Sequence, residues 1–264
     1  MNNTKNIVVG MGEIGLPLFQ LLSKFTPLEG YDKNPQLNRP NSKYLETEFL
    51  HVCVPFDDKF ITNVLLLYKR YNPKGIVIHS TIIPGTTRKL QNKLPIPVIY
   101  SATRGIHKRM LYDLKRYTKF YAIEPDAPRA KWASSSYSKL MKKCGVKTKK
   151  MSNPLTLELA KIVTDTSYYG WLINYAQLSN MIAIKHKINY DEMWSFADEI
   201  HKFLGNRPKM FPGFIGGHCV IPNLDLISDE TLNLIREINS DYTKILKKRH
   251  SRRGIIETTN EDSS

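Results

Sequence analysis

One cysteine in this chain, Cys219, stands in a sequence context that could support covalent chemistry. Gly216, Gly217 and His218 come directly before it, and a proline follows. Glycines let a ligand and the backbone approach each other closely, and His218 and other basic groups favour the thiolate, the nucleophilic form of cysteine. A cysteine is also common as an inert, small core residue, and that alternative stays open. We therefore treat Cys219 as a candidate nucleophile and the three residues before it as candidate substrate-binding residues.

A glycine-rich turn near the N-terminus indicates a second kind of chemistry. In residues 6–18, three apolar residues lead into the turn, and apolar residues then recur at helical spacing. The glycine spacing is that of a dinucleotide-binding turn: Gly10 permits the turn, Gly12 lets a pyrophosphate approach, and Gly15 lets helix and strand pack closely. The phosphates would lie on the N–H groups at the helix start. The predicted cofactor-binding residues of this turn are Gly10, Met11, Gly12, Glu13, Ile14 and Gly15.

An acidic residue, Asp32, follows this turn at the distance at which dinucleotide-binding proteins hold the ribose, ~20 residues on. An aspartate there accepts hydrogen bonds from the ribose hydroxyls and repels a 2′-phosphate, so it favours NAD over NADP. The neighbouring Lys33 weakens that preference, and Asp32 could equally be an ordinary turn residue. We predict NAD as the cofactor.

The composition is that of a folded, basic protein. Of the 264 residues, 41% are apolar, which is enough for a core and for two domains. Lysine and arginine number 39 against 24 acidic residues, a formal charge of +15. This excess favours an anionic partner: a phosphorylated small molecule, a nucleic acid or a membrane surface. No nucleic-acid-binding motif accompanies the charge, so a nucleic acid is disfavoured.

The cysteines and the apolar runs indicate in which cellular compartment the protein is expected. The three cysteines are odd in number and far apart, which indicates neither a disulfide framework nor a paired-thiol zinc site. The N-terminus opens without an apolar signal region, and no run approaches the ~20 apolar residues that span a bilayer. We therefore expect a cytoplasmic protein with no metal site and no membrane association.

Strand-like and helix-like patterns alternate in residues 1–151. Such alternation predicts an α/β fold with a doubly wound (Rossmann) parallel sheet. The predicted strands lie at 7–9, 49–55, 76–79, 97–100, 120–123 and 146–151, and the predicted helices at 60–71 and 128–143. A crossover helix is not expected in residues 33–48. Because such sheets bind ligands at their carboxyl edge, the loops there supply candidate cofactor-binding residues, namely Val54, Pro55, Ser80 and Thr81.

The rest of the chain is predicted to be helical. A very long helix is expected at 155–186, followed by helices at 191–204 and 229–247 and by a loop at 205–223. Apolar residues cover too much of the long helix for one packing partner, so we expect it to pair with its copy in a homodimer. The predicted domains are 1–151 (NAD-binding), 152–248 (helical, carrying the cysteine loop) and 249–264 (a polar, disordered tail).

Five stretches together resemble the UDP-glucose/GDP-mannose dehydrogenase family in order and spacing. They are residues 10–17, the strand end at 53–55, the loop at 80–87, the helix opening at 157–161 and the cysteine loop at 216–219. The resemblance covers about residues 5–225. It implies an enzyme that uses two NAD to oxidise the primary alcohol of a nucleotide sugar to a carboxylate.

The same resemblance implies roles for individual residues. Cys219 would attack the aldehyde formed by the first hydride transfer, and the resulting thiohemiacetal would be oxidised to a thioester and hydrolysed. Lys161 matches the family lysine that stabilises the developing oxyanion by its charge. A solvated helix lysine is the alternative interpretation of Lys161.

Three departures from the family pattern bear on this mechanism. The family usually has Asn four residues after the lysine and Asp four residues after the cysteine, whereas this chain has Asp165 and Asn223. If both face one pocket, a carboxylate remains available as the base. Residues 101–107 lack the family's water-handling glutamate. The chain also ends about 45 residues after Cys219, so the resemblance is to a short form without the C-terminal UDP-binding domain.

Two functions from different classes follow from these observations. The first is an NAD-dependent oxidoreductase that acts on the CH–OH group of a nucleotide sugar. The alternative is a catalytically weakened protein that binds NAD or a nucleotide sugar and acts by association, with another chain supplying the missing domain. The sequence does not identify the sugar.

Overall fold

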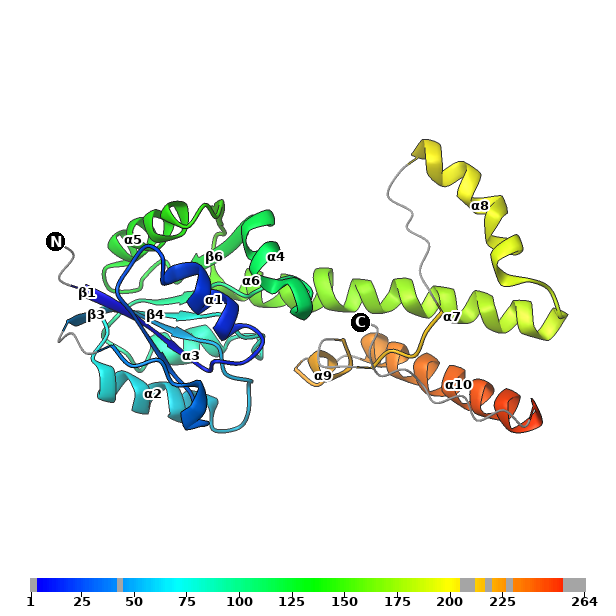
Figure 1. Cartoon of the computed structure of the whole chain (residues 1–264), viewed down its shortest axis with the longest axis horizontal. Helices are drawn as coiled ribbons and strands as arrows, with labels where there is room; N and C mark the ends of the chain where they lie inside the picture. Colours follow the sequence, from blue (N-terminus) through cyan, green and yellow to red (C-terminus); the bar gives the residue numbers. More distant parts are fainter. Residues whose placement is uncertain (1–3, 42–44, 205–211, 217–219, 227–229, 254–264) are drawn as a thin grey trace. The chain divides into compact units, whose positions relative to one another are not determined.

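The structure is a computed structural model that describes residues 4–41, 45–204, 212–216, 220–226 and 230–253. The chain divides into two compact units, Met1–Lys161 and Ile162–Ser264 (Figure 1). The first unit is a sheet flanked by helices, and the second is helical in its described part. The division falls after Lys161, whereas the change in sequence pattern led us to expect it after residue 151.

Seven strands form one sheet in the first unit, in the order β2-β1-β3-β4-β5-β6-β7. They are β1 (Thr4–Val9), β2 (Leu28–Tyr31), β3 (Glu46–Val52), β4 (Gly75–Ile78), β5 (Val98–Tyr100), β6 (Lys119–Ile123) and β7 (Thr148–Lys150). Strands β1 to β5 are parallel, β6 is antiparallel to β5, and β7 is parallel to β6. The expected doubly wound sheet is confirmed, but the expectation that all strands are parallel is wrong for β6 and β7.

The reversal after β5 follows from the short elements that connect it to β6. The connection contains a 3₁₀ turn, η2 (His107–Arg109), and the short helix α4 (Met110–Arg116). A parallel return would need a connection that runs back across the sheet. Helix α4 packs against α1 (Gly15–Leu22) instead, so the chain enters β6 from the carboxyl edge of its neighbours.

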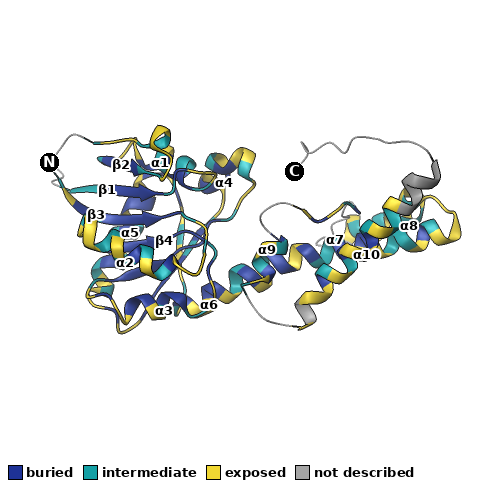
Figure 2. Cartoon of the chain, turned by 90° about the horizontal axis from the view of Figure 1, so that it is seen from below, coloured by how far each residue is buried: buried dark blue, intermediate teal, exposed yellow. Residues whose placement is uncertain are grey.

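Helices cover both faces of the sheet and make three layers (Figure 2). Because side chains alternate along a strand, Val8 and Val77 face one helical layer while Ile7 and Ile76 face the other. The first layer contains α1, α4 and α5 (Ala130–Lys143), and the second contains α2 (Phe60–Tyr71), α3 (Thr86–Gln91) and α6 (Pro154–Leu159).

Two local predictions in this unit are confirmed. Helix α2 has the bounds expected from its apolar pattern, and Asn72 ends it in the left-handed conformation with φ 40°. In the described part of residues 33–48, the connection between β2 and β3 forms one 3₁₀ turn, η1 (Pro35–Leu37), which Asn34 caps, and no crossover helix.

The long helix expected at 155–186 is a continuous helical run with a change of winding inside it. It consists of α6, a π-helical segment (Ala160–Ser167) and α7 (Tyr168–His186). In a π-helix each N–H bonds to the carbonyl five residues earlier, and such turns are frequent at functional sites. Lys161 and Asp165 both belong to this segment.

The other helices of the second unit are α8 (Tyr190–Leu204), α9 (Val220–Leu224) and α10 (Glu230–Arg253). Helix α10 packs along α7, and a small apolar core forms around Ile215, Val220, Leu224 and Ile235. A loop was expected at 205–223, but helix α9 begins at Val220, inside that range. Helix α10 continues through residues 249–253, where the polar tail was expected to begin, and residues 254–264 lie outside the described residues. Of the described helices, none is long and apolar enough to cross a bilayer.

Candidate functional site

The three glycines of the turn after β1 occupy positions that differ in backbone conformation and in the space around them. Gly10 has φ +86°, a conformation that L side chains rarely adopt. A Cβ on Gly15 would lie 1.6 Å from the Gly10 carbonyl oxygen, so close packing excludes a side chain there. A Cβ on Gly12 would meet no atom within 4 Å. Gly10 and Gly15 therefore serve the fold, whereas Gly12 borders open space.

Helix α1 begins at this turn without a side-chain cap. Ile14 is the N-cap residue and makes no capping hydrogen bond, and the first turn holds no acidic residue. The N–H groups at a helix start carry a partial positive charge and attract anions. The turn thus combines open space at Gly12 with an uncapped helix start, which is the arrangement that a pyrophosphate requires.

The two other predicted residues of the turn have side chains that are already engaged. The Met11 side chain is buried in the core. The Glu13 carboxylate lies 2.7 Å from Nδ1 of His107, which belongs to η2. The side chains of Met11 and Glu13 are therefore not available to a ligand at this turn.

Asp32 follows β2 and is bonded to the same turn. Its Oδ2 accepts a hydrogen bond from the Met11 N–H at 2.6 Å, and its Oδ1 accepts one from the Asn34 N–H at 2.8 Å. The Asp32 N–H in turn donates to Oδ1 of Asn38 at 2.7 Å. These contacts are those of a turn residue, and they also hold the carboxylate beside the glycine-rich turn, where a ribose would lie. The preference for NAD over NADP stays a prediction.

The loops after β3 and β4 meet at the same edge of the sheet. Ser80 is buried, and its hydroxyl donates to the Val54 carbonyl oxygen at 2.5 Å. Pro55 is exposed and Thr81 is half-buried, so both border the solvent at this edge. The four candidate residues from these loops are thus brought together by parallel pairing of β3 and β4.

Glu158, for which no role was predicted, holds the loop that leads into α3. Its side chain is fully buried, its Oε2 accepts from the Gly85 N–H at 2.5 Å, and its Oε1 accepts from the Thr87 N–H at 3.0 Å. The Thr87 hydroxyl donates to the same Oε1 at 2.6 Å. A carboxylate that accepts three hydrogen bonds at a helix start neutralises the helix end. The sequence signal for this contact was a glutamate between two leucines, Leu157 and Leu159, in α6.

Two histidines form a buried pair in the sheet, close to the carboxyl ends of β3 and β4. Nδ1 of His51, on β3, lies 2.9 Å from Nε2 of His79, and the rings stack with centroids 5.2 Å apart. Burial, assisted by the charge of Lys119, lowers the pKa of His51 to about 3. Burial and the same charge lower the pKa of His79 well below its ordinary value. Both rings are therefore neutral at physiological pH.

Lys119 supports residues 101–103, which belong to the segment that lacks the glutamate of the family that the sequence resembles. Its side chain is buried, and Nζ donates to the Ser101 carbonyl oxygen and to the Thr103 hydroxyl, each at 3.1 Å. Burial lowers its pKa to about 7. The Lys119 side chain thus holds the backbone of residues 101–103.

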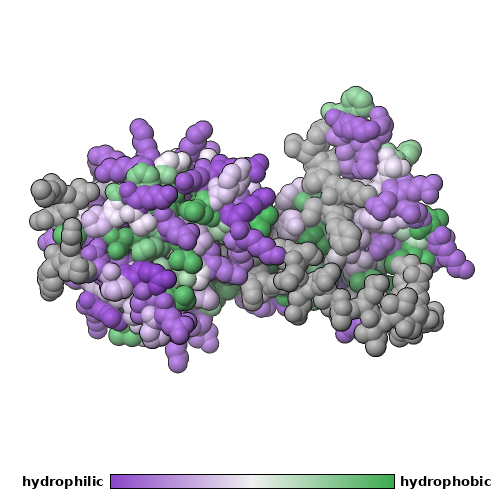
Figure 3. Space-filling view, viewed as in Figure 1, coloured by the Kyte–Doolittle hydropathy of each residue, from purple (hydrophilic) through white to green (hydrophobic). Residues whose placement is uncertain are grey.

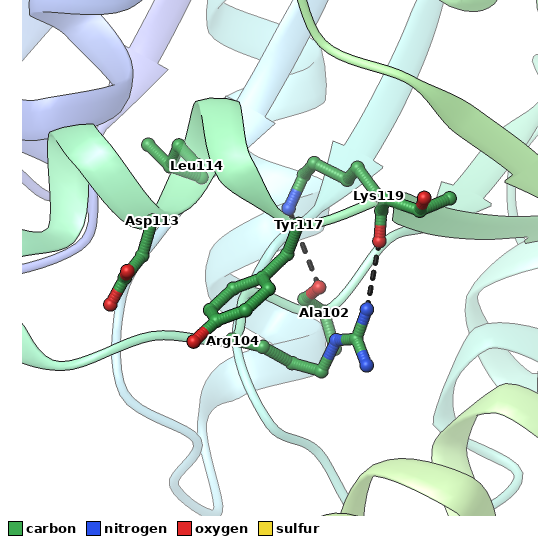
Figure 4. A pocket seen from close by; sticks show the side chains of 7 residues that line it. Ala102, Arg104, Asp113, Leu114, Tyr117 and Lys119 are labelled. Carbon is green, nitrogen blue, oxygen red and sulfur yellow. Dashed lines mark hydrogen bonds between the residues drawn. The ribbon is translucent and has the colours of Figure 1, made fainter.

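A small pocket borders this lysine (Figure 4). Arg104 donates from its guanidinium to the Thr118 carbonyl oxygen at 2.8 Å. Asp113, from α4, contributes a carboxylate to the lining, and this carboxylate accepts from the Ile106 N–H at 2.9 Å and from Nε of Arg109 at 3.1 Å. The Asp113 carboxylate therefore holds the backbone at Ile106 and the side chain of Arg109 in place.

The remaining catalytic candidates lie on both sides of the division between the units. Lys161 is the last residue of the first unit and is half-buried, and Asp165 is a half-buried residue of the second. Asn223 is half-buried on α9. Gly216 is described and exposed, whereas Gly217, His218 and Cys219 lie outside the described residues. The roles of these residues stay predictions, as does the exchange between Asp165 and Asn223.

The part of the chain that the structure describes contains no cluster of three or more His, Cys, Asp or Glu residues that could hold a metal ion. Burial raises the pKa of the Cys53 thiol to about 12, so this thiol is a core residue under the glycine-rich turn. Burial also raises the pKa of the Cys144 thiol, to about 11, so Cys219 is left as the candidate nucleophile on sequence grounds.

Comparison with known proteins gives a likeness of fold. No protein-family model and no curated protein matches the sequence. Among solved structures, a UDP-N-acetyl-mannosamine dehydrogenase from Pyrococcus horikoshii aligns with TM-score 0.76 and 18% identity, over 95% of this chain and 72% of that one. The UDP-N-acetyl-mannosamine dehydrogenase Cap5O from Staphylococcus aureus gives TM-score 0.75 and 18% identity, over 94% of this chain and 70% of that one.

A third similar structure has a different substrate in its name. The 3-hydroxyisobutyrate dehydrogenase from Mycobacterium tuberculosis aligns with TM-score 0.62 and 13% identity, over 94% of both chains. At these identities the three structures establish a shared fold, in which a doubly wound sheet is followed by a helical part.

Proposed function

We propose that this protein is an NAD-dependent dehydrogenase that oxidises the CH–OH group of a nucleotide sugar. The observation that carries the proposal is the uncapped start of α1, where Gly12 borders open space and Asp32 is bonded to the same turn. A pyrophosphate and its ribose need these features. The sugar-nucleotide dehydrogenases of the same fold support the choice of substrate.

The cofactor would lie along the carboxyl edge of the sheet. Its pyrophosphate would bind the N–H groups between Gly12 and Gly15, and its adenosine ribose would bind Asp32. The edge formed by the loops after β3 and β4, which the Ser80 hydroxyl joins, is available to the nicotinamide half. The formal charge of +15 favours an anionic substrate such as a nucleotide sugar over a neutral one.

The thiol of Cys219 would make the reaction a double oxidation. Bound NAD supplies the hydride acceptor in both steps. The alcohol first loses a hydride from carbon and a proton from oxygen, which gives an aldehyde. The Cys219 thiolate then adds to the aldehyde carbon, and the oxygen takes up a proton to give a thiohemiacetal. Loss of a second hydride and of that proton gives a thioester, from which water displaces the thiolate to give the carboxylate.

Charged and polar side chains of the helical run would assist these steps. The Lys161 ammonium group would stabilise the oxygen anion that develops during hydride transfer. Asp165 would act as the general base, since it is the carboxylate at the position where the family carries Asn. Asn223 would donate a hydrogen bond to the substrate, and Gly216, Gly217 and His218 would allow the sugar to approach Cys219.

A catalytically weakened protein that binds NAD or a nucleotide sugar is the second candidate function. The observation that favours it is Lys119, which holds residues 101–103 where a family member carries a glutamate that handles water. Residues 101–103 therefore offer no carboxylate to activate the water that hydrolyses a thioester. Binding without turnover would distinguish this function from the first.

We further propose that the chain forms a homodimer through the second unit. Helices α7 and α8 expose large apolar side chains, and hydrophobic residues are visible over α8 in Figure 3. The most exposed are Tyr168 (54%), Tyr175 (65%), Ile182 (55%), Phe196 (84%) and Phe203 (81%). An apolar surface of this kind usually marks an interface, and a second copy offers the same surface in return. Light scattering at micromolar concentration would contradict the proposal if it gave the mass of one chain.

The test of the function is NADH fluorescence after the protein is mixed with NAD and a panel of substrates. The panel contains UDP- and GDP-sugars and, because of the hydroxyacid dehydrogenase of the same fold, small 3-hydroxy acids. Formation of NADH with a nucleotide sugar supports the first proposal. Tight binding of NAD or of a nucleotide sugar without NADH supports the second, and NADH formed with a hydroxy acid alone would overturn both.

A further inference from the structure

Positive charge is concentrated in one part of the first unit, away from the glycine-rich turn in sequence. Residues 101–150 contain 14 lysines and arginines but three acidic residues. All three acidic side chains form ion pairs with arginines, as Asp113–Arg109, Glu124–Arg88 and Asp126–Arg88. The surface of this part of the chain is therefore strongly basic, and it favours an anionic partner.

Aromatic rings and cations alternate on this surface, beginning at α4. The guanidinium carbon of Arg116 lies 5.9 Å from the centre of the Tyr112 ring and 5.7 Å from the centre of the Tyr117 ring. The guanidinium carbon of Arg104 lies 6.0 Å from the centre of the same Tyr117 ring (Figure 4). Contacts of this length between a cation and a ring are attractive, because the ring face carries partial negative charge.

The alternation continues onto the sheet. The guanidinium carbon of Arg104 is also 5.1 Å from the centre of the Phe120 ring, on β6, and Nζ of Lys149, on the edge strand β7, is 5.8 Å from it. Phe120 and Lys149 are paired in register between the two strands. We call these six residues the cation–aromatic row, namely Tyr112, Arg116, Tyr117, Arg104, Phe120 and Lys149. They come from three separate segments of the chain, so the sequence shows no motif for them.

The cation–aromatic row is accessible, and its side chains restrain one another. Tyr112 is 60% exposed, Tyr117 is 37% exposed, and Arg116 is exposed as well. The Arg104 guanidinium is held by its hydrogen bond to the Thr118 carbonyl oxygen at 2.8 Å. Because neighbouring side chains already limit their motion, a ligand would bind these groups with a smaller loss of side-chain entropy.

We propose that the cation–aromatic row binds single-stranded nucleic acid. Bases stack on exposed aromatic rings while arginine and lysine neutralise the phosphates, which is how proteins bind single strands without reading their sequence. A duplex suits the row less well, because its bases are stacked on one another and present only their edges. An acidic polypeptide would pair with the cations but would leave the tyrosine faces without a partner. The proposal is independent of the dehydrogenase function.

The test is fluorescence anisotropy of a labelled oligouridine of about 20 nucleotides, mixed with the full chain at about 100 mM salt. The variant Tyr112→Ala/Arg116→Ala removes one ring and one positive charge from α4. The control, Lys24→Ala/Phe25→Ala, removes one ring and one positive charge from the segment before β2, where Phe25 is 44% exposed. All four side chains are exposed, so both variants should fold.

Binding should depend on the cation–aromatic row and on salt. We expect Tyr112→Ala/Arg116→Ala to bind the oligouridine about tenfold more weakly than the parent protein or weaker still, since each stacked base contributes strongly. The control should stay within about twofold of the parent protein. Binding should weaken as the salt concentration rises. An RNA duplex of the same length should bind more weakly than the single strand.

Four results would overturn the inference. A parent protein that does not bind the oligouridine refutes it directly, and equal losses in the variant and the control would mean that charge alone acts. Equal or tighter binding of the duplex or of a polyglutamate peptide would assign the surface to another class of partner. Displacement of the oligouridine by saturating NAD would place the RNA at the cofactor edge.

The measurement also separates this inference from the proposed function, because it requires no turnover. Binding that depends on Tyr112 and Arg116 in a protein that forms no NADH would support the inference while the proposed function fails. An active dehydrogenase that does not bind the oligouridine would overturn the inference and leave the proposed function intact.

Discussion

The buried histidine pair in the first unit should make the protein sensitive to mild acid. His51 and His79 share one hydrogen bond, in which one ring nitrogen donates and the other accepts. The other ring nitrogen of His51, Nε2, is buried and has no hydrogen-bond partner among the described residues. A second proton on His51 would therefore be unsolvated, and a proton on either ring would face the charge of Lys119. The folded protein resists protonation that the unfolded chain accepts.

The size of the effect follows from the two pKa values of His51. In the unfolded chain histidine takes up a proton near pH 6.5, whereas in the folded protein the pKa of His51 is about 3. Between these values the unfolded state binds more protons, so the free energy of unfolding decreases as the pH falls, by up to ~1.4 kcal/mol per pH unit. From about pH 6.5 to about pH 5 the loss is on the order of 2 kcal/mol for His51. His79 acts in the same direction.

Urea denaturation of the wild type and of His51→Phe at about pH 7.5 and about pH 5 measures this loss. Phenylalanine leaves Nε2 of His79 unpaired, which destabilises the variant at both pH values by about 1–3 kcal/mol. The decrease between the two pH values should nevertheless be smaller in the variant by about 2 kcal/mol. His186→Gln, which removes an exposed imidazole, is the control. Equal decreases in the wild type and in His51→Phe would refute the reasoning.

Three further predictions concern the cofactor edge. Gly12→Ala should abolish NAD binding in calorimetry yet change the free energy of unfolding by less than about 1 kcal/mol. Gly15→Ala should instead destabilise the fold by about 3 kcal/mol or more, because its Cβ would meet the backbone of Gly10. The reverse pattern would contradict the assignment of Gly12 to the cofactor and of Gly15 to the fold. Glu158→Gln should cost about 1–3 kcal/mol in urea denaturation, since it loses an acceptor for the loop before α3, and a change within experimental error would show that the contact is dispensable. Calorimetry should also show tighter binding of NAD than of NADP, because Asp32 repels a 2′-phosphate, and equal affinities would count against this role of Asp32.

Much of the fold could be predicted because it is encoded locally. Continuous apolar runs predicted the central strands, and the helical spacing of residues 60–71 matched α2 at both ends. The glycine-rich turn was predictable for the same reason, since its spacing reports directly on backbone conformation at Gly10 and on packing at Gly15. The loops after β1, β3 and β4 could be expected at one edge of the sheet, because these strands pair in parallel.

The features that were missed depend on contacts between distant residues. The direction of β6 depends on α4 packing against α1, which no local pattern in residues 101–118 indicates. Glu158 lies more than seventy residues from the loop that it holds. The π winding of residues 160–167 and the end of α10 at Arg253 were not predicted from the sequence either. Candidate site residues could thus be named from the sequence, whereas the distant residues that hold them in place could not.

The most direct measurement of the proposed reaction is the number of NADH molecules formed for each nucleotide sugar oxidised, in the wild type and in Cys219→Ser. The wild type should form two NADH for each carboxylate produced. Cys219→Ser should bind NAD with unchanged affinity but form no carboxylate, because a hydroxyl is a far weaker nucleophile near neutral pH. A Cys219→Ser protein that forms the carboxylate as fast as the wild type, or a wild type that binds no NAD, would contradict the assignment of this chain as a thiol-dependent, NAD-linked sugar-nucleotide dehydrogenase.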